Sequence, residues 1–575
     1  MKQIKICCGL AVVVAAMAWF SASRLLAGEK LDRGVVAIAQ PDGSVYVGWR
    51  LLKSDPKDTG FEVWRWEGNE KPVKLNKEPI TDSTNHVDRT AVTDKTYSYQ
   101  IVSPTEATRD AALMKAGPRP VSVTPATKGA PYVAIPLQGK YVAQKATVAD
   151  LDGDGALDYI IKQPNFNTDP YQRPGYWKKS EDTYKIEAYR HDGKFLWRCD
   201  MGWAIEEGIW YSPVVVYDLD GDGNAEVYTK AGAEGDPREA DGRITTGPEY
   251  LVKLNGMTGK IEKKIAWPSR DGIDDYNYQS RNFLAIAYLD GQKPSLIVER
   301  GTYTLIKVLA YDGDLNLLWK WESSGNDKSY SSQGSHGFNA ADVDGDKCDE
   351  LVIGSASLDH NGKPMWNTGR GHPDAIYVAD IDPDRPGLEI FFGLERARKS
   401  GAVCMADAKT GEIIWENPEP TKHVHGQGMC ADIDATYPGM ESYSRERDSD
   451  TWWLYTAKGE RLKDKPEGSR AVWWDATPQK ALIAGDRNGG RLVKYKGATV
   501  GRIEGNVICI ADCLGDWREE IITCVPGELR IYTSTILATT RRTCLMQNRQ
   551  YRTGVAVETM GYFYPPQLGF VELGE

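Results

Sequence analysis

The sequence predicts an all-β protein whose main body is a β-propeller, and two observations support this fold class. First, six stretches repeat one pattern: a strand that ends in small residues, a tight acidic turn and a second strand. The clearest copies are VADLDGDGALDYIIK from Val148, VYDLDGDGNAEVYTK from Val216 and AADVDGDKCDELVIG from Ala340. Second, the copies span most of the chain, and one such unit cannot bury its apolar face alone. Repeated units therefore favour a radial or linear array.

The acidic turns predict calcium sites. Carboxylates stand at alternate positions and one more closes the turn, which provides the hard oxygen ligands that Ca²⁺ prefers. An EF-hand array is the rival interpretation, but the flanks YIIK, VYTK, LVIG and IFFG are β-branched and aromatic and lack a period of 3.6. Three later copies are degenerate, and the last keeps only Asp512, Asp516 and Glu520. The predicted metal ligands are Asp150, Asp152, Asp154, Asp158, Asp218, Asp220, Asp222, Glu226, Asp342, Asp344, Asp346, Glu350, Asp380, Asp382, Glu389, Asp432, Asp434 and Glu441.

The N-terminus has the layout of a signal peptide over residues 1–27. A basic start at Lys2 and Lys5 precedes an apolar run over residues 6–20 and then small residues. The run is short for a membrane span, although an uncleaved anchor stays an alternative. We therefore expect a secreted or periplasmic protein without a membrane attachment after cleavage. Eight cysteines follow the signal without zinc spacing, and they are interpreted as buried thiols or as disulfides of unknown pairing.

Residues 29–103 predict a separate β-sandwich. The strings VVAIAQPDGSVYVGWRLL, GFEVWRWEG and KTYSYQIVS alternate in polarity and resemble a fibronectin type III domain. Residues 104–129 are rich in Pro, Thr and Ala and are interpreted as a linker. The propeller then occupies residues 130–575. We expect the sandwich to act as a spacer or a packing element.

Composition excludes some function classes. The chain has 575 residues, a formal net charge of −11, 18 Trp and 29 Tyr. An acidic protein is a poor general binder of phosphate backbones, so nucleic acid is not an expected partner. Many aromatic residues with a polar group suit carbohydrate stacking. The composition thus agrees with a carbohydrate-handling protein, and we expect a monomer.

Longer strings give a specific resemblance. The chain resembles polysaccharide lyase family 11, the rhamnogalacturonan lyases, along nearly its whole mature length. The strings that carry the match include SRNFLAIAYLDGQKPSLIVERGTYT from Ser280, SHGFNAADVDGD from Ser335, TGRGHPDAIYVADIDPDRPGLEIF from Thr368, AVWWD from Ala471 and the closing YFYPP. The resemblance implies an eight-bladed propeller, with seven blades as the alternative. It also implies several Ca²⁺ ions, an acidic polysaccharide substrate and β-elimination of the rhamnosyl-galacturonate bond.

Elimination at a uronate requires a base for a carbon-bound proton and a cation that neutralises the neighbouring carboxylate. By resemblance, His336 and His372 belong to the substrate groove near a catalytic Ca²⁺, and each is followed by an acidic turn. Orientation of turns by hydrogen bonds is the alternative role for both. The remaining candidates for catalysis are His425, Lys230 and Arg281, and those for substrate binding are Arg300, Arg370, Tyr303, Gln427 and Tyr562. Salt bridges between blades, core packing or a polar rim are their structural alternatives.

The chain departs from the family at two positions. Gln427 stands where the family usually has an Arg, so His425 is a candidate replacement as base or as positive charge. The family's Asn-Gly-Thr-Lys-like loop is reduced to Gly505-Asn506. Three hypotheses follow: a lyase for a rhamnogalacturonan-like polymer, a calcium-stabilised binding propeller without activity, or an adhesion propeller.

Overall fold

The computed structural model describes residues 30–68, 70–92, 95–103, 121–122, 124–125, 131–171, 175–426, 428–485 and 488–569. The predicted signal peptide and Gln427 lie outside these residues. Within them, no helix has the length and apolar character needed to span a membrane. The structure is all-β, with short helices only.

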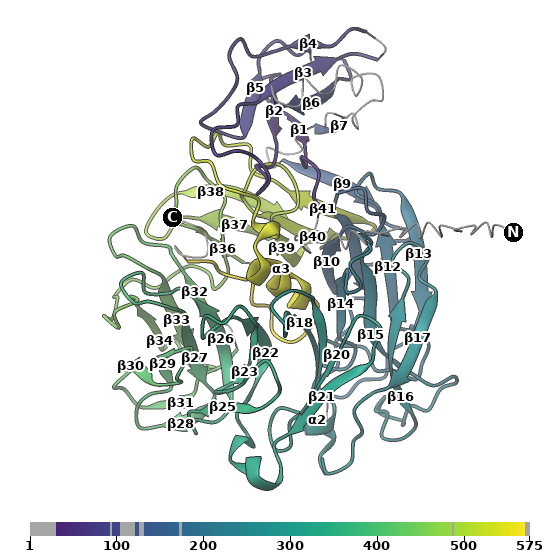
Figure 1. Ribbon diagram of the computed structural model, residues 1–575, viewed down its shortest axis with the longest axis vertical. Coiled ribbons are helices and arrows are strands. Elements are labelled where there is room, and N and C mark those ends of the chain that lie inside the picture. Colours follow the sequence, from purple (N-terminus) through teal and green to yellow (C-terminus); the bar gives the residue numbers. More distant parts are fainter. Residues whose placement is uncertain are drawn as a thin grey trace, which may run out of the picture.

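Two four-stranded sheets form an N-terminal sandwich, at the top of Figure 1. The alternating apolar residues predicted to face inwards, among them Val47, Trp49 and Phe61, are buried between the sheets. Two short strands within the predicted linker complete the sandwich, so the linker is shorter than expected. The strands are β1 (Val36–Ala39), β2 (Val45–Gly48), β3 (Glu62–Trp66), β4 (Val73–Lys74), β5 (Asn85–Asp88), β6 (Ser98–Val102), β7 (Val121–Ser122) and β8 (Thr124–Pro125), in the orders β5-β2-β1-β8 and β4-β3-β6-β7.

Eight antiparallel sheets follow in chain order among the described residues, and we number them sheets 1 to 8. Sheets 1 to 4 are β10 (Lys145–Ala149), β11 (Asp158–Gln163), β12 (Lys185–Tyr189) and β13 (Phe195–Asp200); β14 (Val214–Tyr217), β15 (Glu226–Gly232), β16 (Glu249–Leu254) and β17 (Ile261–Ala266); β18 (Asn282–Ala287), β19 (Ser295–Arg300), β20 (Lys307–Tyr311) and β21 (Leu317–Glu322); and β22 (Gly334–Ala341), β23 (Glu350–Gly354), β24 (Ala356–Leu358) and β25 (Pro364–Asn367).

Sheets 5 to 8 continue the pattern with small irregularities. They are β26 (Pro373–Ala379), β27 (Glu389–Leu394), β29 (Val403–Asp407) and β30 (Ile413–Glu416); β32 (Met429–Ala431), β33 (Glu441–Arg445) and β34 (Trp452–Tyr455); β35 (Ala471–Val472), β36 (Ala481–Ala484), β37 (Gly489–Val493) and β38 (Thr499–Glu504); and β39 (Asn506–Ala511), β40 (Glu520–Val525), β41 (Glu528–Tyr532) and β9 (Tyr132–Pro136). A separate two-stranded sheet pairs β28 (Arg396–Arg398) with β31 (Thr421–His423). Sheet 8 therefore takes its last strand from the start of the array.

The first strands of the sheets are neighbours around a central helix. β10 contacts β14 and β39, β14 contacts β18, β18 contacts β22, and β22 contacts β26. Helix α3 (Arg549–Ala556) touches β10, β14, β18, β22 and β39, and Figure 1 shows it in yellow among the sheets. The other helical segments are α2 (Tyr276–Gln279), η2 (Gly325–Tyr330), η3 (Leu545–Gln547) and η4 (Val557–Thr559). The C-terminal segment thus fills the centre that the first strands surround.

Tryptophans from the outer strands join successive sheets, and we call each such contact a tryptophan clamp. In each clamp the indole Nε1 donates to a main-chain carbonyl in the turn after the third strand of the next sheet. The same indole covers a glycine of that turn, where a Cβ would approach the ring to within 2.5–2.8 Å. The four clamps are Trp197 to Gly256 (2.7 Å), Trp319 to His360 (3.1 Å), Trp366 to Ala408 (2.9 Å) and Trp415 to Ala457 (3.0 Å).

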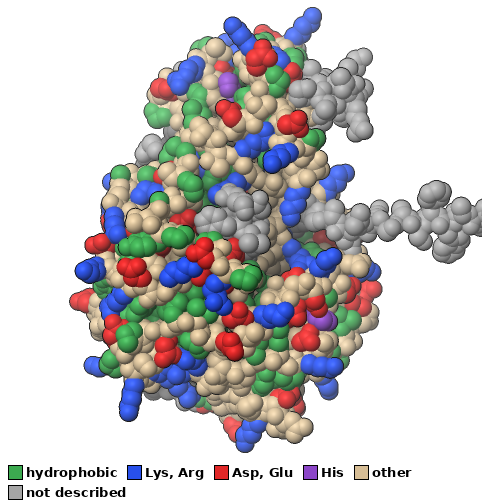
Figure 2. Space-filling view, turned by 60° about the vertical axis from the view of Figure 1, so that its left-hand side comes forward, with side chains coloured by type: hydrophobic (Ala, Val, Ile, Leu, Met, Phe, Trp, Pro, Cys, Tyr) green, Lys and Arg blue, Asp and Glu red, His purple; other side chains and the backbone are tan. Residues whose placement is uncertain are grey.

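The side of the molecule in Figure 2 shows basic and acidic side chains intermixed over the array and the sandwich. No broad field of one sign covers this side.

Candidate functional site

Candidate catalytic side chains gather where the first strands begin. His336 is the third residue of β22, His372 directly precedes β26, and His425 precedes β32. Arg281 directly precedes β18. Since first strands of neighbouring sheets lie side by side, residues distant in sequence meet at this end of the array, which we call the histidine face.

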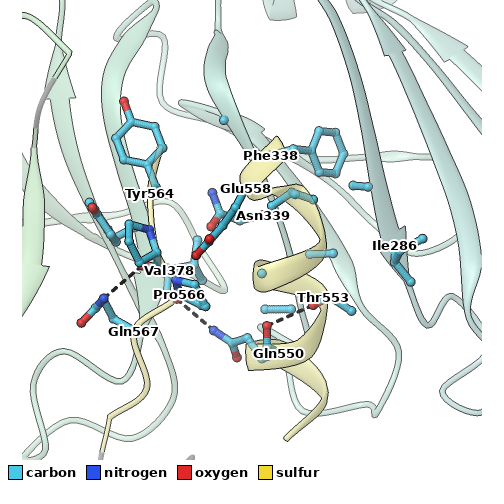
Figure 3. A pocket seen from close by; sticks show the side chains of 18 of the residues that line it. Ile286, Phe338, Asn339, Val378, Gln550, Thr553, Glu558, Tyr564, Pro566 and Gln567 are labelled. Atoms are coloured by element: carbon cyan, nitrogen blue, oxygen red, sulfur yellow. Dashed lines mark hydrogen bonds between the residues drawn. The ribbon is translucent and has the colours of Figure 1, made fainter. Parts of the chain in front are cut away.

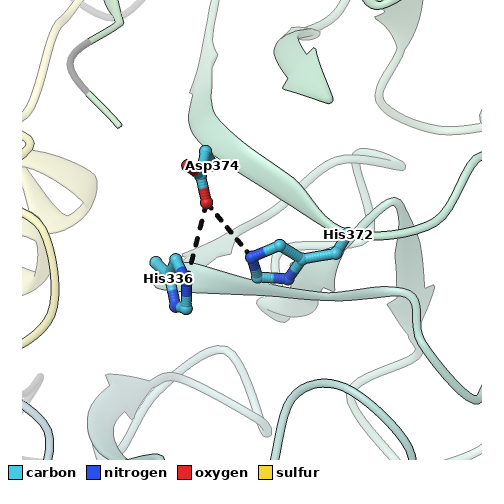
Figure 4. Close-up of side chains that lie close together, drawn as sticks. All are labelled: His336, His372 and Asp374. Carbon is cyan, nitrogen blue, oxygen red and sulfur yellow. Dashed lines mark hydrogen bonds and ion pairs between the residues drawn. The ribbon is translucent and has the colours of Figure 1, made fainter. Parts of the chain in front are cut away.

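The carboxylate of Asp374 is the centre of this face. Its Oδ1 lies 3.5 Å from His336 Nε2 and 3.2 Å from His372 Nε2, as Figure 4 shows, and its Oδ2 lies 2.6 Å from His425 Nδ1. The Gly426 amide also donates to Oδ2 at 3.0 Å. Burial opposes ionisation, but bonds with His372 and His425 and the nearby His336 hold the pKa of Asp374 well below its usual range. Asp374 is therefore a buried anion that orients three imidazoles.

His336 and His372 are buried and form the floor of the site. Tyr303 Oη lies 3.0 Å from His336 Nε2, and His372 Nδ1 lies 2.5 Å from the Gly334 carbonyl oxygen. Burial, followed by repulsion from His372, lowers the pKa of His336 well below its usual value. His336 is consequently a neutral imidazole, and a carbonyl contact fixes the ring of His372.

His425 and His423 form the accessible edge. Their side chains are each 34% exposed, whereas those of His336 and His372 are 3% and 2% exposed. His423 ends β31, and its Nε2 lies 3.3 Å from Glu395 Oε1. A large solute that reaches this face therefore meets His425 and His423 before the buried pair.

An aromatic wall stands beside the imidazoles. The Tyr562 ring lies 4.9 Å from His336 and 5.9 Å from His425, measured between centroids. The Arg281 guanidinium lies 4.3 Å from the centre of the Trp210 ring and donates to Asn277 Oδ1 at 2.7 Å. Arg281 Nη1 has no hydrogen-bond partner among the described residues. The predicted residues Tyr303, Tyr562 and Arg281 are therefore brought together with the histidines.

The other predicted basic residues are engaged elsewhere. Lys230 Nζ and Arg300 Nη1 lie 2.6 and 2.5 Å from the Glu249 carboxylate, and both side chains are buried. Burial opposes ionisation of Glu249, but these two cations lower its pKa to about 2. Both charges are paired with Glu249, by Lys230 within sheet 2 and by Arg300 between sheets 2 and 3, and the roles in catalysis and substrate binding stay predictions. Arg370 pairs with Glu416 at 2.6 Å.

A cavity lies behind the site, beside helix α3 (Figure 3). Its volume is about 50 Å³, and its lining includes Tyr562, Phe283 and Glu558. Burial raises the pKa of Glu558 to about 8. This space admits water-sized molecules and is too small for a sugar ring.

The predicted metal turns lie at the opposite end of the first strands, which we call the acidic-turn face. Asp342 follows β22, six residues after His336. Six residues of extended strand span about 20 Å. An ion in this turn is therefore too far from the imidazoles to touch the same sugar.

Several of the predicted ligands converge. Asp150, Asp152 and Asp158 each place an oxygen within 4.8 Å of the others in the turn of sheet 1. In sheet 4, Glu350 meets Asp359 and His360 in the same way. Burial raises the pKa of Asp150 to about 7 and that of Glu350 to about 8. Carboxyls that resist ionisation without a cation suit a divalent ion.

Three neighbours of the predicted residues were not foreseen. Asp374 stands two residues after His372, and the alternation of a strand puts both side chains on one face. That spacing is the signal that could have identified it. His360 and Trp210 gave no comparable signal, because their partners come from other parts of the chain.

Similarity to known proteins covers nearly the whole chain. Residues 130–575 match "Rhamnogalacturonan lyase family 11, C-terminal domain", and residues 27–115 match "Rhamnogalacturonan I lyases beta-sheet domain". Rhamnogalacturonan endolyase YesW of Bacillus subtilis (strain 168) is 36% identical, over 94% of this chain and 90% of that protein. Rhamnogalacturonan exolyase YesX of the same organism is 34% identical, over 94% and 95%. The crystal structure of YesX superposes with a TM-score of 0.83 at 32% identity, covering 95% of this chain and 96% of that one.

Proposed function

The chain belongs to rhamnogalacturonan lyase family 11, and from this membership we propose that it cleaves rhamnogalacturonan by β-elimination at a galacturonate residue. The observation that supports this proposal most is the buried carboxylate of Asp374 with three imidazoles around it.

We assign the base to His425. Its Nδ1 lies 2.6 Å from Asp374 Oδ2, an arrangement that orients the ring and leaves Nε2 for the proton at C5 of the uronate. His336 and His372 are too buried to reach that carbon. They hold Asp374 in place, and Tyr303 in turn contacts His336.

The galacturonate carboxylate needs a positive partner while the C5 proton leaves. Arg281 lies beside the imidazoles, pairs with Asp169 at 3.2 Å and retains one unused donor, Nη1. His336, His372 and Asp374 each place one donor atom within 4.8 Å of the others, so the three fit a divalent ion. When bound there, such an ion would neutralise the uronate carboxylate.

We further propose that the eight sheets are the blades of one propeller and that Ca²⁺ binds its acidic turns. The succession of eight sheets favours eight blades over seven. The oxygen-rich set of sheet 1 fits Ca²⁺, and its distance from the histidine face gives it a structural role. Export by the predicted signal peptide is part of the same proposal.

A direct assay tests this function. Purified protein is incubated with rhamnogalacturonan I, and the absorbance of the unsaturated uronate is followed for the wild type and for His425→Ala. We expect product from the wild type and nearly none from the variant. Product sizes distinguish internal from terminal cleavage. If the wild type binds the polymer without forming the unsaturated product, the non-catalytic binding propeller replaces the lyase.

A further inference from the structure

We propose that the acidic turn of sheet 5 carries its own cation, the ammonium group of Lys458, where other turns of the array take a divalent ion. This inference deepens the proposed calcium sites and depends on them. It distinguishes turns that take a metal ion from turns whose carboxylates meet a lysine ammonium group.

The geometry at sheet 5 is that of an occupied site. Lys458 Nζ lies 2.6 and 2.9 Å from the two carboxylate oxygens of Asp382 and 2.9 Å from Asp384 Oδ2. Asp382 is almost fully buried, with 3% of its side chain exposed. Three oxygens around one nitrogen satisfy the three donors of an ammonium group. Hydrogen bonds to Asp382 raise the pKa of Lys458, so the lysine keeps its charge.

The position of Lys458 is fixed by the neighbouring sheet contact. Lys458 belongs to the turn after β34 of sheet 6, between Ala457 and Gly459. Trp415 of sheet 5 donates to the Ala457 carbonyl at 3.0 Å, and its ring covers Gly459. The tryptophan clamp therefore holds the turn that delivers the lysine to sheet 5.

The corresponding turn of sheet 5 offers a matched comparison. Lys409 follows Ala408, which Trp366 of sheet 4 clamps in the same way. Lys409 Nζ reaches back to the turn of sheet 4, but it donates to the main-chain oxygen of Asp344 at 3.1 Å. The carboxylates of that turn stay available for a metal. Lys409 and Lys458 thus differ in outcome at one position. Lys496, after the third strand of sheet 7, resembles Lys458, since its Nζ lies 3.1 Å from Asp434 Oδ2 of the sheet 6 turn.

Sheet 8 shows that this chain fills an acidic turn with its own cation elsewhere, because the buried Arg518 pairs with Asp516 of that turn at 2.8 Å. The buried guanidinium of Arg50, from the N-terminal sandwich, donates to the Cys513 carbonyl at 2.5 Å and to Asp32 at 2.9 Å. Burial opposes the charge, but the acidic groups Cys544, Asp32 and Asp512 raise the pKa of Arg50. The degenerate turn of sheet 8 and the sandwich are therefore joined through a basic side chain.

The test counts bound metal. Wild type, Lys458→Ala and the matched control Lys409→Ala are loaded with Ca²⁺ and freed of excess, and calcium per chain is measured by mass spectrometry. We expect Lys458→Ala to bind one ion more than the wild type, and Lys409→Ala to bind the same number. Adding Asp382→Asn to Lys458→Ala should remove the extra ion.

Melting curves give an independent readout. Without calcium, Lys458→Ala should melt below the wild type, and calcium should restore it. An unchanged ion count in Lys458→Ala, or loss of one ion in the single variant Asp382→Asn, would overturn the proposal. Lyase activity plays no part in these measurements, so failure of the proposed reaction and failure of this inference are distinguishable.

Discussion

The two ends of the first strands have opposite chemistry. At the histidine face, nitrogen donors and one buried carboxylate converge from sheets 4, 5 and 6. At the acidic-turn face, carboxylates gather within single sheets, and Lys458 reaches the turn of sheet 5 from the neighbouring sheet. Convergence between sheets produces a site for a substrate. Hydrogen bonds and ion pairs within and between turns hold neighbouring sheets together.

The largest effect is expected for a substitution at the histidine face. His425→Ala removes the accessible base, so kcat should fall by roughly 10²–10⁴-fold while the melting temperature stays constant. His360→Ala, on the acidic-turn face, is the control and should keep the wild-type kcat. If His425→Ala unfolds or keeps full activity, the histidine face is not the catalytic face that we propose.

Removal of metal addresses the other face. Each structural ion adds about 2.7 kcal/mol when free calcium is about 100 times its Kd. A chelator should therefore lower the melting temperature, and Asp158→Asn should reproduce part of the loss, because that buried carboxylate closes the sheet 1 turn. The measurement is calorimetry with and without Ca²⁺. An unchanged melting temperature in the presence of chelator would contradict a structural role for Ca²⁺.

The effect of calcium should also depend on pH. Without metal, the raised pKa values of Asp150, about 7, and Glu350, about 8, mean that the folded state binds these protons more tightly than the unfolded chain. Stability of the metal-free protein should then fall as pH rises from about 4 to about 8. The gain in melting temperature on adding Ca²⁺ should grow over the same interval. A gain that is constant with pH would show that these carboxyls are not the ligands.

The smallest effect concerns the clamps. Trp366→Phe removes the bond to the Ala408 carbonyl and should cost about 1 kcal/mol in the free energy of unfolding. Trp64→Phe, whose Nε1 reaches only Glu62 within the sandwich, is the control and should cost less. Denaturant melts of both variants measure the difference. Equal losses would show that the clamps do not join the sheets.

Much of the fold was predictable, because it depends on local patterns. The strands around Val148 and Val216 form as their β-branched flanks predict, and the family resemblance of the strings is confirmed. The family resemblance also pointed to His336, His372 and His425, and these three side chains meet around Asp374. These residues lie at or just before the first strands of sheets 4, 5 and 6, so the same end of each sheet carries one of them.

The rest depends on contacts between distant segments. Lys230 lies within β15, the second strand of sheet 2, and its charge is paired with Glu249, which the pairing of β15 with β16 brings near. Lys458 reaches a turn of the preceding sheet, and no spacing in the sequence indicates that partner. Sequence patterns predict which residues face one side of a strand, but not which opposite charge arrives from a neighbouring one.

One pairing affects how the protein is made. Strand β9 forms the edge of sheet 8 by bonding to β41, so Tyr132 meets Tyr532 across nearly the whole array. On a ribosome, the early strand has to wait until almost the entire polypeptide has emerged. During that interval both edges are open to wrong partners. Truncation after sheet 7 should therefore yield an aggregation-prone fragment and not a smaller active enzyme, because β9 would lack its partner strand β41.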